Sequence, residues 1–227
     1  MARLPRVVLP GYPHHVTQRG NRRQTVFFCE RDFRLYRKLL AESCSDCGTA
    51  CWAYCLMPNH VHLVLVPDCP DGLRAALAEA HRRYTCHVNI REGWRGHLWQ
   101  ERFHSFPMDE AHLLAAVRYV ERNPVAAGLT DTAADWPWSS ATAHLRGIDD
   151  CLVRVQPLLE RVRDWPAYLA RASDGPLIER LRKHGRTGRP AGSRAFLAAA
   201  EKISGRSLLP RKRGRRPKCG VREGGVK

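Results

Sequence analysis

The chain has 227 residues, of which 44% are hydrophobic, enough for one compact domain of ordinary size and an extension. No stretch approaches the roughly 20 apolar residues that a membrane-spanning helix needs, and the apolar run near the N-terminus is too short for a signal peptide. These features argue against a membrane protein. We expect a cytoplasmic protein whose nine cysteines are mostly free thiols.

The formal net charge of +16 is concentrated at the two ends of the chain. Residues 1–40 contain nine Lys and Arg against two acids, residues 190–227 contain eleven against two, and residues 41–189 contain eighteen of each. Positive charge clustered in this way indicates a polyanionic partner, usually nucleic acid, and we expect association with the nucleoid. A solubilising tail would explain the C-terminal run alone more easily than both ends.

The first half of the chain alternates between predicted strands and helices. Strands are predicted at residues 14–19, 52–56, from residue 60 onward and 99–106, and helices at residues 30–43 and 71–90. Pro58-Asn59 is a turn signal, so the second and third strands should form a hairpin. The order strand, helix, strand, strand, helix, strand predicts an α+β fold, an antiparallel sheet with helices packed on it.

The second half is predicted to be mainly helical. Asp109 can cap a helix over residues 109–123, which Pro124 should end. Further helices are predicted at residues 152–171, 174–183 and near 193–203, before a tail expected to be partly disordered. We therefore divide the chain into a core domain (1–145), an accessory helical segment (146–189) and a basic tail (190–227) that we expect to bind nucleic acid.

Two histidines stand one residue apart in the run MPNHVHLVLV, residues 57–66. Because strand side chains alternate between faces, His60 and His62 should point the same way, while Val61 and Leu63 pack on the other side. The pair could supply two nitrogen ligands to a metal ion. Alone, such a pair is more often two unrelated histidines, so a third ligand and a reactive group are needed to decide.

Tyr119 and Asn123 lie four residues apart, on one side of the last turn of their predicted helix. If that helix packs beside the histidine strand, His60, His62 and Asn123 could hold a divalent ion, Mg²⁺ or Mn²⁺. The phenol of Tyr119 could then attack a phosphate, with the ion stabilising the phenolate as it forms. Alternatively, Tyr119 is a core residue at a helix edge, and Asn123 ends the helix before a proline.

Basic residues in two segments are assigned to DNA phosphates. Arg19, Arg22 and Arg23 follow the first strand, which should lie in the same sheet as the histidines, although a solvated turn would account for them too. In the tail, non-specific phosphate contacts are assigned to Arg211, Lys212, Arg213, Arg215 and Arg216.

Four segments together resemble a known family: HVTQRGNRR, YCLMPNHVHLV, WQERFHSF and VRYVERNPVAAGL. The combination is similar to the single-tyrosine HUH transposases, and more closely to their branch of REP-associated tyrosine transposases, over about residues 5–145. The resemblance implies a ferredoxin-like HUH endonuclease core, with Tyr119 as the nucleophile and His60, His62 and Asn123 as the metal ligands. It also implies that single-stranded DNA is cut and rejoined at hairpin-forming repetitive extragenic palindromes (REPs).

The sequence thus predicts a metal-dependent single-stranded DNA endonuclease and strand transferase that forms a covalent 5′-phosphotyrosine and needs no nucleotide cofactor. One alternative is a catalytically inactive DNA-binding protein or regulator at palindromic repeats. Another is a replication initiator or relaxase on the same HUH core. Whether the protein acts on its hairpins as a monomer or a homodimer is left open.

Overall fold

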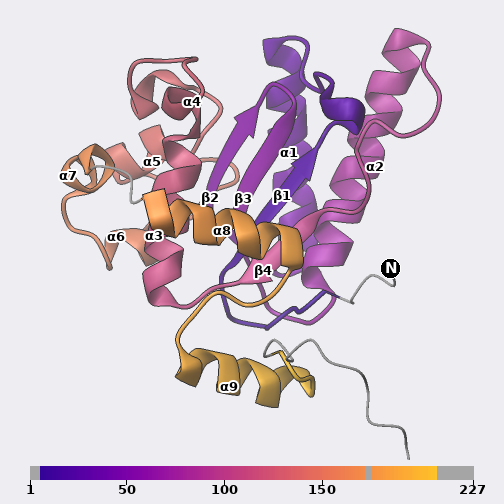
Figure 1. Cartoon of the computed structure of the whole chain (residues 1–227). Coiled ribbons are helices and arrows are strands. Elements are labelled where there is room, and N and C mark those ends of the chain that lie inside the picture. The colour runs from indigo at the N-terminus through magenta and orange to yellow at the C-terminus, as the bar shows by residue number, and fades with distance from the viewer. Residues whose placement is uncertain (1–5, 172–174, 209–227) are drawn as a thin grey trace, which may run out of the picture.

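One four-stranded antiparallel sheet organises the molecule (Figure 1). The structure, a computed structural model, describes residues 6–171 and 175–208. The strands are β1 (His14–Arg19), β2 (Thr49–Met57), β3 (His60–Pro67) and β4 (His104–Pro107), in the order β2-β3-β1-β4. The long helices of this core are α1 (Glu30–Asp46), α2 (Gly72–Glu92) and α3 (Glu110–Glu121). The predicted α+β fold, with a ferredoxin-like sheet and helices packed on it, is confirmed.

Six further helices follow α3 in the part of the chain that the structure describes. They are α4 (Asn123–Ala126), α5 (Ala141–Arg146), α6 (Gln156–Leu159), α7 (Trp165–Ala170), α8 (Gly175–Thr187) and α9 (Arg194–Ser204), with two 3₁₀ turns at Asn21–Arg23 and Ala133–Asp135. Among the described residues, no helix is both long and apolar enough to cross a bilayer.

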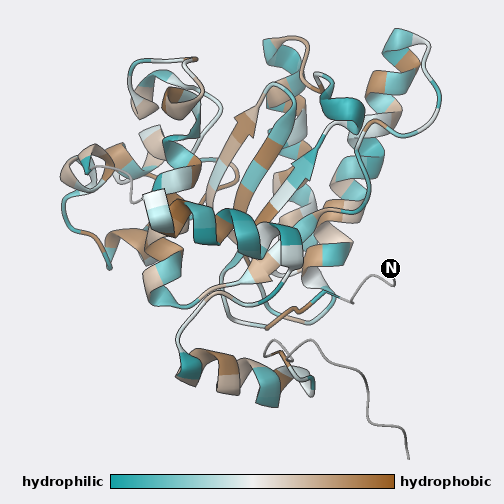
Figure 2. Cartoon of the chain, viewed as in Figure 1, coloured by the Kyte–Doolittle hydropathy of each residue, from teal (hydrophilic) through white to brown (hydrophobic). Residues whose placement is uncertain are grey.

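The two faces of the sheet carry separate hydrophobic clusters, because the strand side chains alternate. Val61, Leu63 and Leu65 of β3 pack in the cluster that includes residues of α1 and α2. Val64, on the opposite face, packs in the cluster that includes Val117 of α3. Figure 1 shows α1 and α2 behind the sheet and α3 and α8 in front of it, and Figure 2 shows the mixture of hydrophobic and hydrophilic residues along the strands. Polar residues of the strands that project toward the α3 side can therefore reach a cavity on that side.

The predicted helix over residues 109–123 is correct in position but too long at its end. Asp109 caps α3 as expected, its side chain accepting the backbone N–H of His112 at 3.1 Å. The helix ends at Glu121, and Asn123 begins the separate helix α4. Pro124 does not stop helical structure there, since proline is tolerated in the first turn of a helix, where its missing N–H costs nothing.

Two further predictions on element boundaries are wrong. The strand predicted at residues 99–106 is confined to His104–Pro107, because the chain turns at Glu101, whose φ is +56°. The helix predicted at residues 152–171 is two short helices, α6 and α7, each with a proline in its first turn. A hydrophobic pattern alone did not reveal these breaks.

Candidate active site

The strand register gathers polar side chains on the α3 side of the sheet. β1 and β3 pair antiparallel, with Thr17 opposite His62 and Arg19 opposite His60. Residues at alternate positions share a face, so His60 and His62 lie on the same side of β3, as predicted. His15, two residues before Thr17, joins them from β1, and its ring stacks on that of His62 with centroids 5.2 Å apart.

Hydrogen bonds occupy the same nitrogen in both predicted metal-binding histidines. The Nδ1 atom of His60 lies 2.6 Å from Oδ1 of Asn59, and the Nδ1 atom of His62 lies 3.0 Å from Nε2 of His15. The first bond fixes the protonated nitrogen, since the amide oxygen can only accept. In each ring Nε2 is the nitrogen left for a ligand. Hydrogen-bonding the second nitrogen in this way is how proteins orient metal-binding imidazoles.

The histidine cluster is neutral at physiological pH. Burial, with a contribution from Arg19, lowers the pKa of His60 to about 4. The pKa of His62 falls well below its usual value because of burial, and also because of His15, His60 and Arg19. Burial alone lowers the pKa of His15 to about 4. Neutral imidazoles keep the lone pairs that a metal ion needs.

Tyr119 reaches this cluster from the last turn of α3. Its ring meets that of His62 edge to face with centroids 5.4 Å apart, and that of His15 at 6.2 Å. The tyrosine side chain is half-buried. Within residues 6–171 and 175–208 no hydrogen bond engages the Tyr119 hydroxyl, so the phenol oxygen is available to a reactant.

The histidines and the tyrosine line one cavity of about 780 Å³. Of the predicted site residues, the structure brings together His60, His62, Tyr119, Arg19 and Arg23 in its lining. Asn123 does not line this cavity, because α3 ends before it, and Arg22 is exposed outside it. The predicted tail residues Arg211, Lys212, Arg213, Arg215 and Arg216 lie outside the described residues.

Sequence reasoning missed three groups of lining residues, the third of which is Gln100, Glu101 and His104, before and at the start of β4. The first is His15 and Thr17 on β1, whose alternation with Arg19 in HHVTQR could have placed all three on the histidine face. The second comes from α8, which contributes Glu179, Arg182 and Arg186. Nothing in the local sequence indicates that α8 crosses the sheet in front of β1 and β3, as Figure 1 shows.

The site offers a divalent ion two nitrogen ligands from the protein and leaves its other coordination positions open. Among the described residues no group of three or more His, Cys, Asp and Glu side chains is arranged to hold a metal. The Nε2 atoms of His60 and His62 offer two nitrogen ligands from one strand face. Such a pair leaves further positions to oxygen ligands, a mixed shell that Mn²⁺ accepts more readily than Mg²⁺.

Comparison with known proteins points to one family. Residues 10–123, about half of the chain, match the family described as IS200-like transposases, and this range contains His60, His62 and Tyr119. A Haemophilus influenzae protein that carries the name REP-associated tyrosine transposase is 25% identical over 116 residues. That match covers 46% of this chain and 66% of the relative, just under two thirds of its length.

A solved structure has the same fold. The structure of a REP-associated tyrosine transposase bound to a REP hairpin superposes with a TM-score of 0.56 at 21% sequence identity. The superposition covers 66% of this chain and 90% of that one. A third of the present chain thus has no counterpart in that structure.

Proposed function

The chain belongs to the IS200-like transposases, and from this premise we propose that it cuts and rejoins single-stranded DNA at hairpin-forming repeats of the REP type. Tyr119 would be the nucleophile, and His60 and His62 would hold Mg²⁺ or Mn²⁺. The observation that supports this most directly is the meeting of Tyr119 with the two histidines in one cavity. The named relative and the hairpin-bound structure support the choice of substrate.

In the proposed reaction, the phenol oxygen of Tyr119 attacks the scissile phosphorus. The Tyr119 O–P bond forms and the P–O3′ bond breaks, so the phenol proton is lost and the leaving 3′-oxygen takes up a proton. The product is a 5′-phosphotyrosine, and the reverse attack by a 3′-OH rejoins a strand without a nucleotide cofactor. A divalent ion bound at the site would polarise the scissile phosphate and stabilise the phenolate.

The other residues of the site hold and orient the reactants. Asn59 and His15 fix the rings of His60 and His62 through their Nδ1 atoms. Arg19 and Arg23, at the rim of the same cavity, are placed to bind the phosphates on either side of the cut. Asn123 stays the predicted third ligand, although it does not line the cavity.

Tyr119→Phe tests the proposal. The phenylalanine variant removes only the hydroxyl, so we expect no covalent adduct and no cleavage, while hairpin binding changes less than about twofold, because an exposed hydroxyl contributes little to binding. The measurement is denaturing gel electrophoresis after incubation with a labelled hairpin from the source genome's repeats and Mn²⁺ or Mg²⁺. Tyr12→Phe is the matched control, because Tyr12 lies outside the cavity, and it should form the adduct at the wild-type level.

Two outcomes would contradict this proposal. Cleavage that persists in Tyr119→Phe would exclude Tyr119 as the nucleophile. Tight hairpin binding by the wild type without an adduct, with either ion, would favour the non-catalytic DNA-binding protein.

A further inference from the structure

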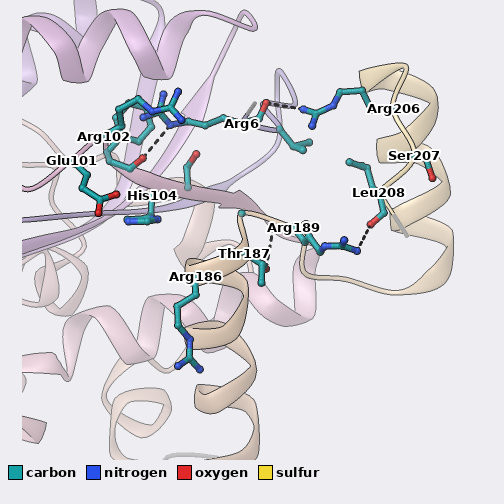
Figure 3. A pocket seen from close by; sticks show the side chains of 14 residues that line it. Arg6, Glu101, Arg102, His104, Arg186, Thr187, Arg189, Arg206, Ser207 and Leu208 are labelled. Carbon is teal, nitrogen blue, oxygen red and sulfur yellow. Dashed lines mark hydrogen bonds between the residues drawn. The ribbon is translucent and has the colours of Figure 1, made fainter. Parts of the chain in front are cut away.

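A second cavity, lined by arginines, adjoins the active-site cavity. Its volume is about 350 Å³, and we call it the arginine cavity. Its arginines come from four separate parts of the chain: the N-terminal segment, the loop before β4, the end of α8 and the segment after α9. They are Arg6, Arg102, Arg186, Arg189 and Arg206 (Figure 3).

Most of these side chains are held in place by the protein itself. Arg6 donates from Nε to the carbonyl of Phe103 at 3.1 Å, and its guanidinium lies 3.6 Å above the centre of the Phe103 ring. Arg206 donates to the carbonyl of Arg6, and Arg189 donates to that of Leu208, each at 3.2 Å. Figure 3 shows Arg6 and Arg102 close together, and Arg186 pointing away from them. Fixed guanidinium groups with unused N–H donors are suited to bind an anion.

Positive charge in this cavity exceeds what nearby acids neutralise. In the part of the chain that the structure describes, no salt bridge joins a carboxylate to Arg6, Arg102 or Arg189, whereas Arg186 pairs with Glu179 at 3.1 Å. Burial and the charge of Arg102 lower the pKa of Arg6 to about 10. Arginines that crowd together without carboxylates destabilise the fold unless an anion joins them.

The arginine cavity continues into the active-site cavity. Glu101, His104 and Arg186 line both. Glu101 has a left-handed backbone, with φ of +56°, at this junction. Such strain in a non-glycine residue persists only where the surrounding structure imposes it, and it is commonest at functional sites. A strand bound at Tyr119 could therefore extend directly between the arginines.

We infer that the arginine cavity binds phosphates of the single-stranded DNA that flanks the cleavage site. This inference rests on the proposed function, because it assumes that such a strand enters the neighbouring cavity. Phe103, one face of which Arg6 covers, also lines the cavity, and arginines beside an aromatic ring are typical of sites for single strands. Residues 186–189 and 206–208, which follow the core domain in sequence, would then be part of the DNA-binding site.

Arg102→Gln is the sharpest test, since no hydrogen bond within residues 6–171 and 175–208 engages the Arg102 guanidinium and its loss should not disturb the fold. In a Tyr119→Phe background, which prevents cleavage, fluorescence anisotropy would measure binding of a bare hairpin and of hairpins with a short single-stranded flank on either side. We expect Arg102→Gln to weaken binding of one flanked hairpin by about 10-fold, the effect of one charge-assisted phosphate contact, and to spare the bare hairpin. The dependence of log affinity on log salt should flatten by roughly 0.7.

Arg31→Gln is the matched control. Arg31 is exposed on α1, on the other face of the sheet, so the variant loses the same charge without touching either cavity, and its affinities should equal those of the parent. If Arg102→Gln binds the flanked hairpins with the same affinity as its parent, the inference is overturned and the proposed function still stands. Failure of the wild type to bind any of these oligonucleotides would overturn both. Displacement of the flanked hairpin by micromolar inorganic phosphate would show a site for a small free anion and overturn the assignment to a strand.

Discussion

The ring of His15 decides which nitrogen of His62 is available to a ligand. His15 lies beneath His62, with its Nε2 atom 3.0 Å from Nδ1 of His62, and it is almost fully buried. For His62 to bind a metal through Nε2, its Nδ1 must carry the proton and His15 must accept it. The low pKa of His15, about 4, keeps that ring neutral and able to accept at neutral pH.

His15→Phe should therefore weaken metal binding without removing a ligand. We expect the affinity for Mn²⁺, measured by isothermal titration calorimetry without DNA, to fall by about 10- to 100-fold, the usual effect of losing an orienting partner. His15→Gln keeps a hydrogen-bonding amide and should recover most of the affinity. Equal Mn²⁺ affinities in the phenylalanine variant and the wild type would show that His15 only fills space.

At the scale of elements, one buried carboxylate fixes the end of α3 that carries Tyr119. Glu121 is fully buried and accepts hydrogen bonds from Ser140 at 2.6 Å, from Nδ1 of His144 at 2.6 Å and from Nε1 of Trp165 at 3.0 Å. These partners belong to the start of α5, to α5 itself and to α7. The bonds tie three helices together two residues after Tyr119.

Glu121→Ala should unfold the protein more easily. The substitution removes the acceptor shared by three buried donors and leaves Ser140 and His144 only their longer bonds to the carbonyls of Tyr54 and Ser140. We expect the free energy of unfolding to fall by about 3–5 kcal/mol, the range for removing one partner of a buried polar network. Urea denaturation followed by circular dichroism gives this value. Glu110→Ala is the comparison on the same helix: its ion pair with Arg161 is largely exposed and should be worth less than about 1 kcal/mol. If the two variants lose similar amounts of unfolding free energy, the hydrogen bonds of Glu121 do not hold α3 in place.

Local patterns in the sequence predicted the strand and the helix at the centre of the site, but not the elements around them. The alternation around His60 and His62 and the helical spacing before Tyr119 predicted the two elements that meet at the cavity, because each signal lies within one strand or one helix. The position of Asn123 was harder to predict, because α3 ends at Glu121 and Asn123 begins α4, so its assignment as third ligand stays a prediction. The position of α8 depends on contacts between residues far apart in the chain, which periodicity does not encode.

At the scale of the whole molecule, positive charge gathers on the side of the sheet where the active-site cavity lies. Arg19, Arg23, Arg182 and Arg186 line that cavity, and the arginine cavity lies beside it. Figure 1 shows the N-terminal segment and α9 at the same end of the sheet. Arg6, before β1, and Arg206, after α9, line the same cavity, so the described parts of the two basic ends are close enough in space to act on one polyanion.

The end of the chain should strengthen DNA binding without adding specificity. Residues 209–227 contain eight Lys and Arg against one Glu, and no aromatic residue that could stack on bases. Deleting these residues removes no part of α9, so we expect weaker binding by similar factors for a REP hairpin and for an unrelated single strand of equal length. The slope of log affinity against log salt should flatten by at least about 1, because several phosphate contacts are lost.

The control for that deletion keeps the length of the chain and changes only its charge. Replacing Arg211, Lys212, Arg213, Arg215 and Arg216 by Gln removes five of the eight basic residues and should reproduce most of the change in slope. Because the effect is electrostatic, the truncated and full-length proteins should converge in affinity as the salt concentration rises. If deletion instead weakens binding of the REP hairpin alone, residues 209–227 recognise the hairpin specifically, and the non-specific role assigned to them is wrong.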